Sequence, residues 1–462
     1  MTKLINAALI LCLMLFLPSC NKISMDGLAK APTNLFPKQL FNKNTGTQTD
    51  KNDSKIEDLI SGASASVDTS SGFQAAVKSA VLSHPSVILS KQEYFKQLEA
   101  VSITRSQKDF QVSSTIYGGV EDVTDETAGV ALVLNASRLV YDAGQLDSQV
   151  SAGEFLVKAA DNSYKAVVEE RSLEAARVWV QLERYQALDE LISSRLRVLE
   201  PLIKQLEQVA ESGIGDVSMI AAAERTVSQI LVAQMEVSEN LELAKVNFEN
   251  VFGEITKVPN YSAELISNSI PPTIDDGVLL LAPGLLAEYY SYKASIASLN
   301  AIRAKDDFTV GFESKVQRPF GGSEYDSDET IGLIARKTIF NGNRLDAEIK
   351  QGEAQVSARA NSVKVSYRNG KRAIDAGLQT ITSSEKALKL AKENLDNARE
   401  EISYLRKQLV IGQSTLENVL SAEARLYDAE SKELNLQADL RIAELSTLSA
   451  IGYLAKVFNI IE

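Results

Sequence analysis

The side chains that most often carry catalysis are scarce in this chain. Its 462 residues include one histidine, His84, and two cysteines, Cys12 and Cys20. A zinc site or a Cys/His pair needs several such groups together, so neither is expected. Gly370-Lys371 lacks both the upstream glycine and the following serine or threonine of a nucleotide-binding loop. We therefore predict a protein that is not an enzyme and holds no cofactor or metal, with His84 as a turn or cap residue.

Cys20 has a predicted covalent role. Lys3 precedes an apolar run, 4–17, that is too short for a permanent membrane span, and the run ends in Leu17-Pro18-Ser19-Cys20. This ending resembles the lipobox of bacterial lipoproteins, in which the cysteine becomes the acylated first residue. We predict a signal peptide at 1–19 and a lipid-anchored extended linker at 20–71. An ordinary signal peptide, cut nearby, is the alternative.

Two stretches, 109–140 and 307–340, alternate between apolar and polar or small residues, which predicts a pair of strands in each. Strands of about 10 residues with one apolar face can cross an outer membrane within a closed barrel. A soluble sandwich could show the same pattern. Four strands cannot close a barrel that spans a bilayer, so several chains would have to pool their strands. The residues predicted to face lipid are Val112, Ile116, Val130, Leu132, Phe308, Val310, Phe312, Ile331 and Leu333.

The rest of the chain reads as long helices arranged in a tandem repeat. Matching landmarks, such as Asp109-Phe110 with Asp307-Phe308 and Gly213 with Gly412, lie 198 or 199 residues apart. Pro201 is expected to kink or interrupt the first long helix. The predicted divisions are a first repeat at 72–258 with a helical hairpin at 141–252, a connector at 259–282, a second repeat at 283–455 with a hairpin at 341–453, and a tail at 456–462.

Charge and surface pattern narrow the partners. Lys+Arg 48 against Asp+Glu 61 gives a net charge of −13, which argues against nucleic-acid binding. The long helices carry small and apolar residues at three- and four-residue spacing, a pattern that normally packs against other helices. With no globular layer beside them, these helices are expected to find partners in other copies of the chain.

The order of elements, the strand-to-helix junctions 139–147 and 339–346, and the hairpin tips 212–217 and 411–416 resemble the TolC family of outer-membrane efflux and secretion channels. The resemblance implies a mainly α fold with a membrane β-barrel portion: a homotrimer with a shared twelve-stranded barrel and an α-helical periplasmic tunnel. It also implies that the tips dock onto a periplasmic membrane-fusion adaptor joined to an inner-membrane ABC, RND or MFS pump. The docking residues would be Gly213, Ile214, Gly215, Asp216, Gly412, Gln413, Ser414 and Thr415.

The resemblance further implies an aperture just after the second tip, lined by Glu417, Asn418 and Ser421. Some family members have an acidic ring there. In this chain the ring is either absent or moved to Glu417 and Glu423, and Ser414 stands where some members have a latching arginine.

Two functions follow. The first is an outer-membrane exit channel, lipid-anchored, for type I secretion or multidrug efflux. The alternative is a lipid-tethered periplasmic coiled-coil scaffold or adaptor. A scaffold should bury the apolar strand rows, whereas a channel should expose them to outer-membrane lipid.

Overall fold

The computed structural model describes residues 67–122, 127–211, 217–254, 276–320, 323 and 325–461. All of them belong to one compact unit, Ala63–Glu462. Cys20, the signal peptide, the first tip at 212–216 and most of the connector lie outside the described residues. In the part of the chain that is described, no helix combines the length and the apolar character needed to cross a membrane.

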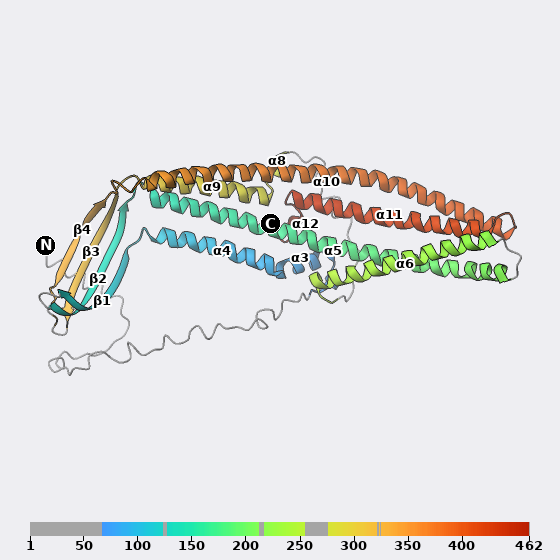
Figure 1. The fold of residues 1–462 in the computed structure, drawn as a ribbon, viewed down its shortest axis with the longest axis horizontal. Helices are drawn as coiled ribbons and strands as arrows, with labels where there is room; N and C mark the ends of the chain where they lie inside the picture. Colours follow the sequence, from blue (N-terminus) through green and yellow to red (C-terminus); the bar gives the residue numbers. More distant parts are fainter. Residues whose placement is uncertain are drawn as a thin grey trace, which may run out of the picture. The chain divides into compact units, whose positions relative to one another are not determined.

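The elements follow the predicted order, helix then strand pair then helical hairpin, twice over (Figure 1). The first half contains η2 (Thr69–Ser71), α3 (Phe73–Ser83), α4 (Pro85–Ser106), β1 (Gln111–Asp122), β2 (Thr127–Tyr141), α5 (Gln145–Glu211) and α6 (Val217–Phe252). The second half contains α8 (Asp276–Leu279), α9 (Pro283–Ala304), β3 (Thr309–Phe320), β4 (Asp328–Arg336), α10 (Arg344–Val410), α11 (Leu416–Ala450) and α12 (Leu454–Val457).

The two halves match in length and in contacts. Helices α4 and α9 have 22 residues each, and α5 and α10 have 67 each. The ion pairs Arg105–Glu154 and Arg303–Glu353 both measure 2.8 Å, and each joins the short helix of its half to the long one. A glycine of the long helix lies beside each pair, where the short helix approaches closely.

Local signals explain where the short helices begin. Both α4 and α9 start with a proline at the first helical position, where its missing N–H is not needed. His84 is the N-cap of α4, and its Nδ1 accepts the backbone N–H of Ser86 at 3.2 Å. The predicted cap role of His84 is therefore confirmed.

Pro201 is the residue expected to kink or interrupt the first long helix. The predicted interruption is wrong, because α5 continues through this residue to Glu211. Proline removes one helical hydrogen bond, at a cost of about 3 kcal/mol. The adjoining turns are held by tertiary packing: Leu199 is buried and Leu202 packs against the same apolar cluster, which joins α5, α6 and α11. This packing offsets the local penalty.

The described strands form one antiparallel sheet in the order β1-β2-β3-β4. Strand β2 extends one residue beyond the predicted pair, to Tyr141, whereas β4 ends at Arg336. Ile339 and Phe340, predicted as strand, lie outside it and are highly exposed. Strands β1 and β4 form the two outer edges of the sheet.

The helices beside the sheet repeat its order. Helix α4 packs on α5, α5 on α9, and α9 on α10, so that α4 and α10 lie at the two edges of this layer (Figure 1). In the sequence, the edge helix α4 directly precedes the edge strand β1, and the edge helix α10 directly follows the edge strand β4. In the described residues of this unit, the strand layer and the helix layer therefore each form an open arc.

The main core lies where α3, α5, α6 and α12 meet. Trp179 is fully buried, and its ring centroid lies 5.4 Å from those of Phe73 and Phe252 and 5.5 Å from that of Phe248. Phe458, just after α12, packs edge-on against Phe73 at 5.4 Å. This aromatic cluster anchors the segment after α12 to α3.

Candidate functional site

The sheet has one apolar face. Residues paired directly across antiparallel strands share a face, and the register pairs Ile116 with Leu132, Gly118 with Val130, Phe312 with Leu333, and Val310 with Ala335. The predicted lipid-facing residues of the strands therefore all fall on the same side, and Phe308 directly precedes β3. Val112 and Ile331 are 73% and 74% exposed, so this face is uncovered in the isolated chain. Contact with lipid stays a prediction.

The opposite face is polar. It carries Ser113 and Thr115 of β1, which pair with Asn135 and Val133 of β2. It also carries two ion pairs that join β3 to β4: Lys315–Asp328 at 3.2 Å, and Glu313 with Arg336, which meet through both carboxylate oxygens. A sheet with this asymmetry can separate an apolar medium from an aqueous one.

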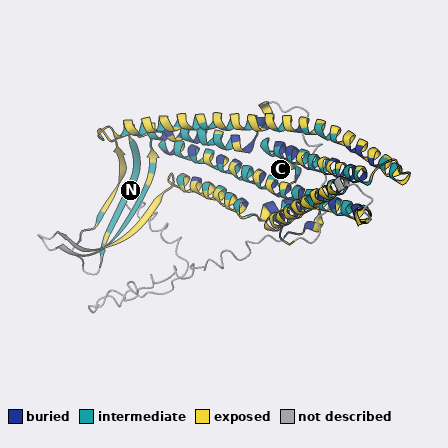
Figure 2. Ribbon diagram, turned by 45° about the vertical axis from the view of Figure 1, so that its right-hand side comes forward, coloured by how far each residue is buried: buried dark blue, intermediate teal, exposed yellow. Residues whose placement is uncertain are grey.

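The two edges of the arc are also uncovered. Helix α10 buries only Ile374, Ile381, Leu395, Ala398 and Ile402 among its 67 residues, and Figure 2 draws much of it as exposed. The other edge, formed by α3 and α4, exposes a set of large apolar side chains: Leu82, Ile88, Leu89, Phe95, Leu98 and Ile103. An apolar surface of this extent marks an interaction site.

The second hairpin tip is a defined turn. The N–H groups of Gly412 and Gln413 donate to the carbonyls of Leu409 and Gln408 at 3.1 and 2.8 Å, and Gly412 has φ 72°, which favours glycine. Thr415 then caps α11, because its Oγ1 accepts the N–H of Asn418 at 3.2 Å. Val410 and Ile411, at the end of α10, are 86% and 65% exposed. They give this tip an apolar surface that the sequence prediction did not include.

The predicted aperture residues follow the cap on α11. Asn418 is exposed, whereas Glu417 and Ser421 are half-buried. Glu423 is only 1% exposed. It therefore cannot line an aperture, and the idea that an acidic ring moved to Glu423 is wrong.

Glu423 instead belongs to an ion-pair network that joins three helices. Arg195 of α5 donates to Glu423 at 3.2 Å and also contacts Glu430. Arg406 of α10 pairs with the other carboxylate oxygen of Glu423, and Arg399 lies 3.6 Å from Glu430. Two arginines from different hairpins thus converge on one buried carboxylate beside the tip. The sequence signal was incomplete, because Glu423 matches Glu224 of the first repeat, which is exposed.

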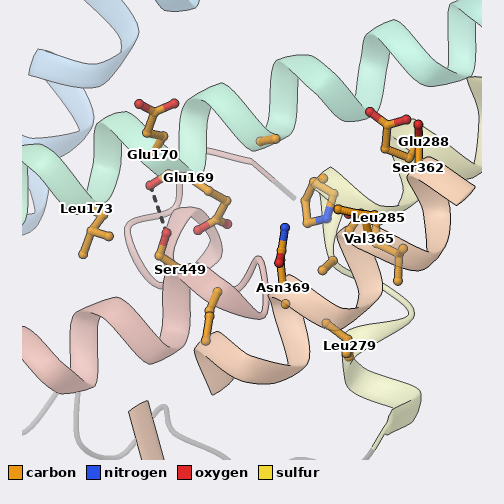
Figure 3. A pocket seen from close by; sticks show the side chains of 18 of the residues that line it. Glu169, Glu170, Leu173, Leu279, Leu285, Glu288, Ser362, Val365, Asn369 and Ser449 are labelled. Carbon is orange, nitrogen blue, oxygen red and sulfur yellow. Dashed lines mark hydrogen bonds between the residues drawn. The ribbon is translucent and has the colours of Figure 1, made fainter. Parts of the chain in front are cut away.

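A second buried carboxylate was also missed. Glu169 of α5 is 3% exposed, and its two oxygens accept the N–H groups of Leu454 and Ala455, both at 3.1 Å. Burial raises the pKa of Glu169 to about 8, against the smaller lowering effect of these two N–H groups. Glu169 lines a cavity of about 860 Å³ between α5, α9, α10 and α11 (Figure 3). In the sequence it is one of two adjacent glutamates on a long helix, with no sign of burial.

Comparisons with known proteins bear on the whole arrangement. A model of the outer membrane efflux protein family matches residues 307–453. Outer membrane efflux protein BepC of Brucella suis is 20% identical over 363 residues, covering 77% of this chain and 80% of BepC. Outer membrane protein TolC of Vibrio cholerae is 22% identical over 377 residues, covering 78% and 85%. The probable outer membrane lipoprotein SilC of Salmonella typhimurium is 22% identical over 281 residues, covering 57% and 60%.

Solved structures share the fold. The crystal structure of CusC superposes with a TM-score of 0.72 at 17% identity, covering 82% of this chain and 91% of CusC. VceC of Vibrio cholerae gives a TM-score of 0.71 at 16% identity, covering 82% and 96%. The likeness therefore extends over both repeats. The second repeat thus matches the outer membrane efflux protein family, and the chain as a whole shares the fold of outer-membrane channels and is similar to BepC and TolC.

Proposed function

We propose that this chain is the outer-membrane exit channel of a tripartite efflux or type I secretion system. The single observation that carries the proposal is a four-stranded sheet with one uncovered apolar face, one polar face and two free edges. Free backbone groups at those edges could not remain in lipid without partners. Further copies must therefore pair β4 of one chain with β1 of the next.

Three copies are proposed, giving a twelve-stranded barrel. The apolar faces would contact lipid, and the polar faces with their ion pairs would line a wet passage. The helix arcs would close in the same order, α10 against α4 of the next copy, which would cover the exposed row on α3 and α4. The passage would then continue through the helices into the periplasm.

The tips are proposed to dock onto a periplasmic membrane-fusion adaptor, which connects the channel to an inner-membrane ABC, RND or MFS pump. The exposed Val410 and Ile411, beside Gly412 to Thr415, supply an apolar surface for this contact. Transport would be passive in this chain, with the pump supplying energy. Acylation of Cys20 would anchor the chain to the outer membrane, in keeping with the lipoprotein description of SilC.

Two measurements test the channel. Protein purified from membranes should require detergent, run as a trimer and conduct ions in planar bilayers. The edge pairing is tested by joining Tyr117→Cys in β1 with Ile334→Cys in β4. These two positions lie opposite each other when the contact between copies repeats the internal pairing of Asn135 with Lys315. Cys12 and Cys20 are the only native cysteines.

The expected product of the edge pairing is a disulfide-linked trimer. Asn135→Cys, on the inner strand β2, replaces Tyr117→Cys as the matched control and should give no linked oligomer. A water-soluble monomer without conductance would overturn the proposal.

The scaffold alternative requires the apolar strand rows to be buried within the subunit. Val112, Ile116, Ile331 and Leu333 are instead strongly exposed. No contact among the described residues covers this face, so the observations favour the channel.

A further inference from the structure

The end of the sheet that joins the helices carries the same basic and aromatic side chains in both repeats. In the first repeat these are Phe110, Arg138 and Tyr141, and in the second they are Phe308, Lys337 and Phe340. Each pair of equivalents is separated by the 198- or 199-residue offset of the duplication. The set is therefore part of the repeated unit, because it occurs at equivalent positions in both repeats.

The side chains of the first repeat lie on the apolar side of the sheet, together with Phe308 of the second. Arg138 pairs with Phe312 across β2 and β3, and its guanidinium lies over the Phe110 ring, 5.2 Å from the centroid. The Phe110 ring packs edge-on against Phe312 at 5.9 Å, and Tyr141 lies 5.2 Å from Phe308. All four rings are at least partly exposed, and none is part of the helical core.

Lys337 is assigned to the same side by its equivalence to Arg138 in the repeat and by alternation. It directly follows Arg336, whose side chain pairs with Glu313 on the polar face. Strand β4 ends at Arg336, and continued strand alternation would direct the next residue, Lys337, to the apolar side. Phe340, three residues later, is 82% exposed.

Within the described residues, neither Arg138 nor Lys337 has a carboxylate partner, unlike the lysine that precedes each strand pair. Lys108 pairs with Asp147, and Lys305 with Glu348 at 2.8 Å. Arg138 makes one hydrogen bond, from Nε to the Lys108 carbonyl at 3.3 Å, which leaves its two terminal nitrogens free of any acceptor in the described residues. Lys337 is exposed and has no ion pair in that part of the chain.

An unpaired cation on a lipid-facing surface is stable only at the depth of polar headgroups. At the other end of the apolar face the charge is neutralised, because Arg318 pairs with Glu329. Arg318 lies opposite Leu132, so six residues of β2, about 20 Å of strand, separate it from the level of Arg138. The apolar face between them is bounded by a neutral pair on one side and by free cations on the other.

We propose that Arg138 and Lys337 bind the phosphate groups of phospholipids in the periplasmic leaflet, and so fix the depth of the sheet in the membrane. The proposal rests on the channel function proposed above. The planar guanidinium fork matches a phosphate, and the lysine supplies a point charge. The flanking rings would contact the upper acyl chains beneath the headgroup, as aromatic side chains do at membrane interfaces. Each chain would carry two such sites.

Native mass spectrometry of the purified trimer tests this inference. The probes are phosphatidylglycerol and a galactosyl diacylglycerol that has similar acyl chains but no phosphate. Wild type should retain two phosphatidylglycerol molecules per chain at the lowest lipid concentrations and none of the galactolipid. The double variant Arg138→Gln/Lys337→Gln should bind phosphatidylglycerol at least tenfold more weakly, because each site loses its charge-assisted hydrogen bonds.

Two controls separate charge from folding. Arg138→Lys/Lys337→Arg keeps both charges and should retain the lipids. Lys315→Gln removes a positive charge from the opposite face of the same sheet and should leave lipid binding unchanged. Equal binding by the double Gln variant, or equal retention of the galactolipid by wild type, would refute the inference while trimer formation and conductance still supported the channel. Absence of trimer and conductance in wild type would overturn both.

Discussion

Replacing the buried carboxylate beside the second tip should loosen that tip specifically. Glu423 is held by Arg195 of α5 and Arg406 of α10, so it ties the two hairpins together. In Glu423→Gln the shape of the side chain is kept, but the negative charge is lost. The two guanidinium groups then face a neutral amide, and Arg406 is left without its carboxylate partner.

The size of the effect follows from burial. Hydrogen bonds to charged groups contribute about 1.5–3 kcal/mol each, and breaking a buried ion pair by removing one partner costs about 3–5 kcal/mol. Glu423 is fully buried and makes two such bonds, but Arg195 keeps its contact with Glu430 and Arg406 is half-exposed. We therefore expect the free energy of local opening to fall by about 3 kcal/mol, which corresponds to roughly a hundredfold change in an equilibrium constant.

Hydrogen exchange measured by mass spectrometry reads this opening directly. Amides of α11 between 416 and 430 should exchange roughly a hundredfold faster in Glu423→Gln, while those of the aromatic core around Trp179 should not change. Glu224→Gln is the matched control, because Glu224 occupies the equivalent position in the first repeat but is exposed. A change below threefold in Glu423→Gln, or an equal change in the control, would show that the network does not hold the tip.

Three further changes test other parts of the structure. Burial raises the pKa of Glu169 from 4.5 to about 8, so between these pH values the folded chain binds a proton that the unfolded chain lacks. The free energy of unfolding should therefore fall by up to about 5 kcal/mol as pH rises through this window. Glu169→Gln should flatten the profile of thermal midpoint against pH. Leu333→Arg, on the apolar face, should weaken folding into liposomes in a urea titration by about 2–4 kcal/mol, whereas Ser113→Arg on the polar face should not. Gly377→Ala should lower the thermal midpoint, because the added methyl group would overlap the buried Thr447 hydroxyl and overpacking costs about 1–3 kcal/mol.

Features set by local sequence could be predicted. The two-residue period marked the strands, and the proline beside His84 marked the start of α4. The constant offset between repeats then tied strands, long helices and tips into one unit, so the order of the elements followed. The register places the predicted lipid-facing residues of the strands on one face of the sheet. This could be predicted because the face to which a strand residue points is set by the two-residue alternation alone.

Features set by distant partners could not be predicted. Glu423 is buried because Arg195, 228 residues earlier, lies beside it. Glu169 accepts N–H groups from residues 285 and 286 positions later. Its sequence neighbours are those of an ordinary solvated helix face, so no local pattern distinguishes it. The continuity of α5 through Pro201 likewise depends on packing between helices.

The duplication also indicates how copies can join without a new kind of contact. Within one chain, the first repeat meets the second where β2 pairs with β3 and α5 packs on α9. The elements at the two free edges are equivalent to those of this junction. Strand β4 and helix α10 correspond to β2 and α5, whereas β1 and α4 correspond to β3 and α9. A head-to-tail contact of this kind closes into a ring when its rotation divides a full turn. In the proposed ring, each chain would be a pair of equivalent segments, and neighbouring chains would repeat the junction that each chain already makes internally.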